Sequence, residues 1–149
     1  MRTLAVSPNN VRTLADSGIV CHDVRNPAQR NEVLVRKGSS VSADDVRALL
    51  QRGVEDLHLA IPDVDDVSEG AAAQRLAAAV AGPGVELTRP HFGQVSLRSA
   101  GRGLLRVDRA ALDRVNELPG ALLLTAEPDR PVDAGMTLGV AKCAPLFLP

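Results

Sequence analysis

The stretch VLVRKGSSVSADDVRALLQRGVEDLHLAI, residues 33–61, decides how the first half of this chain folds. Its first residues, 33–35, are apolar and mostly β-branched, which predicts a short strand that stops at Lys37-Gly38. A helix with an apolar stripe is predicted to follow and to end at Gly53. From Val54 the hydrophobic period changes to two, with Leu57, Leu59 and Ile61 on one face, which predicts a second strand.

The start of that helix is marked by several physical signals at once. Ser42 predicts an N-cap, because its hydroxyl can accept one of the unpaired N–H groups of the first turn. Asp44 and Asp45 place negative charge near the positive end of the helix dipole. Val41 and Val46 have the spacing of a hydrophobic staple across the cap. These signals predict a helix boundary at Ser42.

Before this stretch, residues 18–24 alternate in a way that predicts a strand containing a His22-Asp23 pair. Neighbouring residues on a strand point to opposite faces, so these two side chains are not expected to act on each other. His22 would share a face with Val20 and Val24 and is expected to be a half-buried structural histidine, with a site role as the alternative.

After it, residues 62–70 are rich in carboxylates, but their spacing does not match a calcium loop, which favours acidic capping of the next helix. That helix is predicted over 67–81 and is stopped by residues 82–84, Gly-Pro-Gly. Its many alanines favour close packing on a sheet, with Leu76 and Val80 on its heavier face.

The remaining residues form short alternating runs separated by turn residues. Residues 93–98 and 104–107 flank a glycine-containing loop, 99–103, that predicts a β-hairpin; the glycines do not match a dinucleotide or P-loop motif. Asp108 is predicted to cap a short helix over 109–116.

The last part of the chain is notably apolar. Residues 121–125 are apolar on both faces and predict a central strand. After turns that contain proline and glycine, residues 136–143 follow as a further segment, and residues 144–149 are again apolar, which is unusual for a terminal segment. We expect the final segment to dock, to pair in an oligomer or to lead into further protein.

Composition narrows the functional classes. The chain has 17 basic and 18 acidic residues, a formal net charge of -1, no Trp, no Tyr and two Phe. Nucleic-acid and membrane partners are therefore not expected, because there is neither a basic surplus nor a set of stacking rings. The two cysteines, Cys21 and Cys143, lack CxxC spacing and are expected to be buried thiols in a reducing compartment, with a redox pair or metal ligands as the alternative. A cytoplasmic location is predicted.

These patterns predict an α+β fold with mixed or antiparallel strands, about three helices and a hairpin-rich C-terminal half. We expect one compact unit with two small lobes, an N-terminal α/β lobe over 1–88 and a C-terminal lobe over 89–149.

The order of motifs resembles the N-terminal region of molybdopterin-binding proteins of molybdenum-cofactor biosynthesis, distant relatives of the molybdopterin molybdotransferases. The resemblance covers most of residues 18–147. Its motifs are Cys21-His22-Asp23-Val24, Arg36-Lys37-Gly38, Ser42 to Val46, Leu49 to Gly53, Gly93 to Leu97, Gly103 to Val107, Asn116, Thr125, Val132, Gly135 and Ala144-Pro145-Leu146. It implies a non-catalytic accessory or N-terminal domain that shapes a cleft or a dimer contact for a molybdopterin-binding domain.

The resemblance also implies that molybdopterin is bound mainly by a separate α/β domain, whose glycine- and serine-rich loop has no counterpart here. The sequence departs from the family at Arg25, where a Thr is typical, and at residues 126–128, which replace a histidine-containing turn. The candidate ligand-binding residues are His22, Asp23, Lys37, Gly38 and Thr125.

Two other functional classes stay open. In a stand-alone small-molecule or oxyanion binder, the Lys37 ammonium and the backbone N–H groups at Gly38 would hold an anion. An enzyme is the third possibility, but His22, His58 and His91 lie on separate predicted elements without a nucleophile motif. No catalytic residue and no metal ligand is therefore assigned from the sequence.

Overall fold

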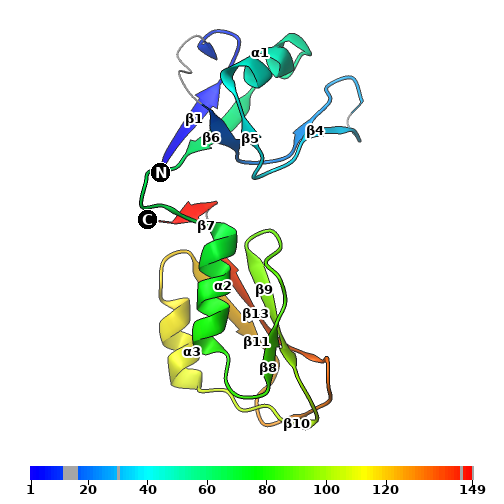
Figure 1. Ribbon diagram of the computed structural model, residues 1–149, viewed down its shortest axis with the longest axis vertical. Coiled ribbons are helices and arrows are strands. Elements are labelled where there is room, and N and C mark those ends of the chain that lie inside the picture. Colours follow the sequence, from blue (N-terminus) through cyan, green and yellow to red (C-terminus); the bar gives the residue numbers. More distant parts are fainter. Residues whose placement is uncertain (12–16, 30, 145, 149) are drawn as a thin grey trace. The chain divides into compact units, whose positions relative to one another are not determined.

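A computed structural model of the protein describes residues 1–11, 17–29, 31–144 and 146–148. The chain divides into two compact units, Met1–Asp66 (unit 1) and Val67–Pro149 (unit 2), each with its own hydrophobic core (Figure 1). In the described residues the strand pairs within the units are antiparallel and three helices pack beside them, so the predicted α+β fold class is confirmed.

Unit 1 is built on a four-stranded sheet in the order β1-β6-β2-β5. A separate two-stranded ribbon joins β3 to β4, and one helix, α1, follows β5. The elements are β1 (Arg2–Val6), β2 (Gly18–Val20), β3 (Val24–Arg25), β4 (Val33–Val35), β5 (Ser40–Val41), α1 (Ala43–Gln51) and β6 (Leu57–Ile61). The strand–turn–helix–strand order predicted for residues 33–61 is confirmed, with β5 added before the helix.

The predicted N-terminus of α1 is also confirmed, and its cap is reciprocal. Ser42 Oγ accepts from the Asp45 backbone N–H at 3.2 Å, and Asp45 Oδ2 accepts from the Ser42 backbone N–H at 2.9 Å. Val41 and Val46, the predicted staple, are 4% and 0% exposed. The cap therefore fixes the direction in which α1 leaves β5 and turns its apolar stripe toward the core.

Unit 2 is built on a second four-stranded antiparallel sheet in the order β11-β13-β9-β8. Two short ribbons, β10-β12 and β14-β7, lie outside this sheet. The elements are β7 (Val67–Ser68), α2 (Glu69–Val80), β8 (Val85–Leu87), β9 (Gln94–Ser99), β10 (Gly103–Leu104), α3 (Arg109–Asn116), β11 (Ala121–Thr125), β12 (Pro131–Val132), β13 (Thr137–Cys143) and β14 (Phe147–Leu148).

Helix α2 packs across β9 and β13, and α3 packs against β11 (Figure 1). Ala73 and Ala77 of α2 are fully buried, whereas Leu76 and Val80 are only partly buried beside them. The small side chains therefore face the sheet most closely, as the alanine content predicts. The predicted cap of α3 is confirmed, since Asp108 Oδ1 accepts from the Ala111 N–H at 2.9 Å.

The boundary between the units differs from the one expected after residue 88. It lies between Asp66 and Val67, because α2 buries its alanines in the core of unit 2 and β8 pairs with β9. Helix α2 and its N-terminal strand therefore belong to the second unit.

The predicted hairpin around residues 99–103 does not form. Both edges of β9 are already occupied, by β8 on one side and β13 on the other. Residues 103–104 instead form β10, which pairs with β12. The tight hairpin of unit 2 joins β8 to β9, with two hydrogen bonds between His91 and Gln94 at its tip.

The prediction that residues 121–125 form a central strand was wrong, because β11 is an edge strand beside β13. Leu123 is buried on the helix-covered face, but Leu122 and Leu124 are 41% and 58% exposed on the other face. The two inner positions belong to β13 and β9, and the buried Gly139 and Ala141 of β13 leave room for close packing.

The apolar C-terminal segment docks within unit 2. Phe147 and Leu148 pair with β7, and the Glu69 N–H donates to the Leu146 carbonyl at 2.8 Å. Leu148 also packs against the core of this unit. Of the outcomes expected for this segment, docking is the one that the described residues display, while Pro145 and Pro149 lie outside them.

Candidate functional site

The candidate residues His22 and Asp23 do not lie on a strand. Strand β2 ends at Val20, and residues 21–23 form a bend before β3, so the predicted strand over 18–24 is interrupted. His22 is exposed, not half-buried as expected, and its ring centroid lies 5.4 Å from that of His58. The bend carries the His22 ring away from the face that buries Val20.

The same bend brings Asp23 to the turn that contains Lys37 and Gly38. Asp23 Oδ1 accepts from the Lys37 backbone N–H at 2.9 Å, and the Gly38 N–H donates to the Val20 carbonyl at 2.8 Å. Gly38 has φ +83°, a conformation that a glycine adopts without steric cost. The two backbone donors of this turn are thus both bonded within unit 1, and an added anion would compete with a carboxylate.

The two cysteines are thiols without a disulfide bond. Burial raises the pKa of Cys143, and burial also raises that of Cys21, where the nearby Lys37 charge acts in the opposite direction. Because the thiolate is the reactive form, both side chains are poor nucleophiles at neutral pH.

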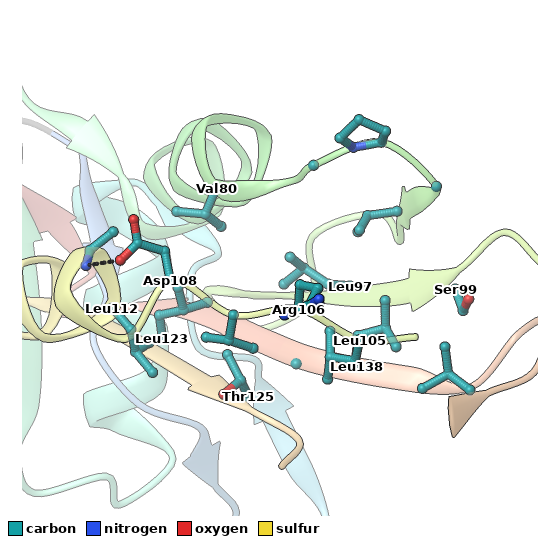
Figure 2. A pocket seen from close by; sticks show the side chains of 18 of the residues that line it. Val80, Leu97, Ser99, Leu105, Arg106, Asp108, Leu112, Leu123, Thr125 and Leu138 are labelled. Carbon is teal, nitrogen blue, oxygen red and sulfur yellow. Dashed lines mark hydrogen bonds between the residues drawn. The ribbon is translucent and has the colours of Figure 1, made fainter. Parts of the chain in front are cut away.

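The fifth candidate, Thr125, lies in unit 2 on the wall of a cavity of about 1110 Å³. Figure 2 shows Val80, Leu112 and Leu123 around this space, together with Leu97 and Leu138 of the sheet. The cavity lies on the helix-covered face of the sheet, where β9, β11 and β13 meet α2 and α3. Its remaining side is formed by the segment 101–108, which crosses from β9 to α3.

The walls of the cavity are mostly aliphatic. Helix α3 contributes Leu112 and Val115, which are only partly buried, and no residue of this helix is fully buried. Ser99 is 5% exposed, and its hydroxyl donates to the Gly101 carbonyl at 2.6 Å. The cavity therefore offers an apolar surface with few open hydrogen-bonding groups, which is typical of sites for small organic molecules.

Charged side chains line the cavity where the crossing segment and α3 reach solvent. They are Arg102, Arg106, Asp108 and Arg114. Arg106 forms a 3.5 Å ion pair with Asp129, and both side chains are largely exposed. Asp108 is occupied as the cap of α3. The arginine side chains are therefore the charged groups of the cavity that can form an ion pair with a ligand.

Sequence reasoning found Thr125 but missed the rest of this cavity. The run Leu104 to Val107 was assigned to a hairpin, although only Gly103–Leu104 is a strand. One signal in the sequence indicates these walls. The apolar run 104–107 leads directly into the amphipathic helix 109–116, so both segments have an apolar face that must pack against something.

The described residues include no group of three or more His, Cys, Asp or Glu side chains arranged to hold a metal ion. Among the helices of the described part of the chain, none is both long and apolar enough to cross a membrane. Comparisons with protein-family models, with curated proteins and with solved structures find no match for this chain.

Proposed function

We propose that this chain is a non-catalytic accessory or N-terminal domain of a cytoplasmic molybdopterin-binding protein, which shapes a cleft or a dimer contact for a cofactor-binding domain. The observation that carries the proposal is that the candidate polar groups of unit 1 form structural hydrogen bonds. Asp23 and the backbone of Lys37 and Gly38 hold a turn together, and the cavity of unit 2 has aliphatic walls. The order of motifs that resembles the molybdopterin-binding proteins supports the same assignment.

The surface that we assign to the contact is the outer face of β11. Leu122 and Leu124 are exposed there, on the side of the sheet opposite α2 and α3. Val140 of β13 lies beside Leu124 in the strand register and is half-buried. Exposed apolar side chains that form a contiguous patch mark sites of protein contact.

Sedimentation velocity of the chain, alone and mixed with a molybdopterin-binding α/β domain, tests this proposal. We expect a homodimer or a complex with that domain, and we expect pterin fluorescence after oxidation to stay with the α/β domain. Leu124→Lys should weaken the association by about tenfold. The matched control is Val64→Lys, because Val64 is a fully exposed apolar residue of unit 1. A chain that neither dimerises nor binds the domain contradicts the proposal.

The second candidate function is a stand-alone small-molecule binder, and the cavity of unit 2 is the observation that favours it. The oxyanion form of this hypothesis concerns the turn at Lys37, where an anion would have to displace the Asp23 carboxylate. Calorimetric titration with molybdate and phosphate tests it, with Asp23→Asn as the variant that removes the competing charge. Flat heats in both proteins would exclude an oxyanion site at this turn.

A further inference from the structure

The cavity of unit 2 has a size and composition that specify a class of ligand. Its volume of about 1110 Å³ lies slightly above the range of about 300–1,000 Å³ that is usual for small-molecule sites. The aliphatic residues Leu97, Leu123 and Leu138 form its floor on the sheet. Leu112 and Val115 of α3 face the same core but are only partly buried. An apolar ligand body would complete their burial, which is favourable in proportion to the area covered.

A polar ring system would be held poorly in this space. A pterin carries many hydrogen-bonding groups, and burying each of them without a partner costs free energy. The wall hydroxyls are those of Ser99 and Thr125, and the Ser99 hydroxyl already donates to a carbonyl. The cavity chemistry therefore differs from what molybdopterin itself requires.

The charged groups favour a negative end on the ligand. Arg102, Arg106 and Arg114 line the cavity, while the Asp108 carboxylate accepts the capping hydrogen bond of α3. Arg106 and Arg102 also lie 3.5 and 4.0 Å from two aspartates, Asp129 and Asp133, which lower the net charge nearby. Such exposed pairs are weak, so a carboxylate can share these guanidinium groups.

We propose that the cavity binds a small amphipathic carboxylate, with its hydrocarbon chain among the leucines and its head group at Arg106. This assignment is independent of the contact proposed for the outer face of β11. It concerns the face of the sheet that α2 and α3 cover.

Displacement of a fluorescent dye, anilinonaphthalene sulfonate, from the whole chain tests the proposal. The competitors are decanoate, decan-1-ol and decylamine, which share one chain length and differ in the head group. The protein contributes no tryptophan or tyrosine background, since it has neither residue. We expect decanoate to bind about fivefold more tightly than the alcohol and the amine to bind most weakly.

Two pairs of variants locate the ligand. Ala111→Trp fills the cavity from α3 and should weaken decanoate binding by about tenfold or more, whereas Ala110→Trp, on the same helix but outside the cavity, should not. Arg106→Gln should weaken decanoate binding by about fivefold and leave decan-1-ol unchanged, and Arg75→Gln on α2 is its control.

Far-UV circular dichroism confirms that each variant is folded. Arg106 is exposed, so its variant keeps the test valid even if Ala111→Trp does not fold. No displacement from the wild-type chain, or equal effects of the two tryptophan variants, would overturn the cavity as the site. Equal binding of the acid, the alcohol and the amine would overturn the assignment of a carboxylate ligand.

Discussion

Replacing Asn116 by alanine tests how the edge of the unit 2 sheet is protected. Asn116 Nδ2 donates to the Leu123 carbonyl at 3.1 Å, and its Oδ1 accepts from the Leu123 N–H at 2.7 Å. The side-chain amide thus replaces a neighbouring strand at the centre of β11. Without it, both backbone groups of Leu123 would face solvent or pair with another chain.

The size of the effect follows from these two hydrogen bonds. A net contribution of about 0.5–1.5 kcal/mol each gives a loss of about 1–3 kcal/mol. The higher helix propensity of alanine at the end of α3 offsets up to about 0.7 kcal/mol. With the full offset, we expect unit 2 to lose about 0.3–2.3 kcal/mol of unfolding free energy, which lowers its Tm by roughly 4–8 °C per kcal/mol.

Thermal unfolding followed by far-UV circular dichroism measures the stability. Hydrogen exchange of the Leu123 amide directly measures the protection that the Asn116 side chain gives it. Asp113→Ala is the control, because Asp113 lies on the same helix and aspartate and asparagine have similar helix propensities. The reasoning is refuted if Leu123 exchanges in the wild type as fast as an unprotected amide, or if Asn116→Ala is as stable as Asp113→Ala.

Three further predictions concern single positions. Ser42→Ala should lower the free energy of unfolding of unit 1, measured with a chemical denaturant, by about 1 kcal/mol, because it removes one half of the capping box. The hydrogen bonds from the Ser42 hydroxyl and backbone N–H lower the pKa of Asp45, so their contribution to stability is complete above a pH of about 3.9 and is lost as the pH falls through the lower folded pKa. A pH series of unfolding midpoints should show this slope, and the slope should be smaller in Ser42→Ala, which keeps only the backbone hydrogen bond. Gly120→Ala should destabilise unit 2 more than Gly84→Ala does, since both have positive φ but a Cβ at Gly120 would lie 2.3 Å from a carbonyl oxygen; equal unfolding temperatures would contradict this. Phe92→Gly should stabilise unit 2 by about 1 kcal/mol because Phe92 has φ +47°; an unchanged or lower unfolding temperature would contradict this.

Elements fixed by neighbouring residues could be predicted from the sequence. The start of α1 at Ser42 and of α3 at Asp108 follows from side chains that bond to backbone groups three residues away. The alternation that begins at Val54 likewise predicted the strand β6, which the structure has at Leu57–Ile61. In each case the deciding interaction lies within a few residues, so tertiary packing did not have to be known.

Predictions that depended on tertiary competition failed. The hairpin after β9 was reasonable from turn residues alone, but it lost to pairing of β9 with β8 and with the distant β13. The apolar strand β11 was placed at the centre of a sheet because burial on both faces was assumed. The bend at His22 depends on Asp23 reaching Lys37, fourteen residues later. None of these outcomes is encoded in a local pattern.

The cavity of unit 2 was not predicted from the sequence, for the same reason. Thr125 was found through resemblance, and it does line the cavity. The other walls come from α2, β9, β13 and the crossing segment 101–108, which are separated along the chain. A cavity is the space that packing leaves between such elements, so its volume and lining depend on the sheet order that the sequence did not reveal.

The two faces of strand β11 allow the proposed protein contact and the proposed ligand site to coexist in unit 2. Asn116 blocks both outward backbone groups of Leu123, so a second strand cannot add at that register. Exposed Leu122 and Leu124 can then be covered only through their side chains, face to face. The alternate residues, Leu123 and Thr125, line the cavity on the opposite face.

This alternation predicts that the two roles separate by mutation. Leu124→Lys should weaken association and leave decanoate binding unchanged, because its side chain lies on the outer face. Ala111→Trp should weaken decanoate binding and leave association unchanged, because Ala111 lines the cavity. Sedimentation velocity and dye displacement, measured on both variants, test whether association and decanoate binding change separately. If either variant changes both properties, the strand couples its two faces, and separate roles for them are wrong.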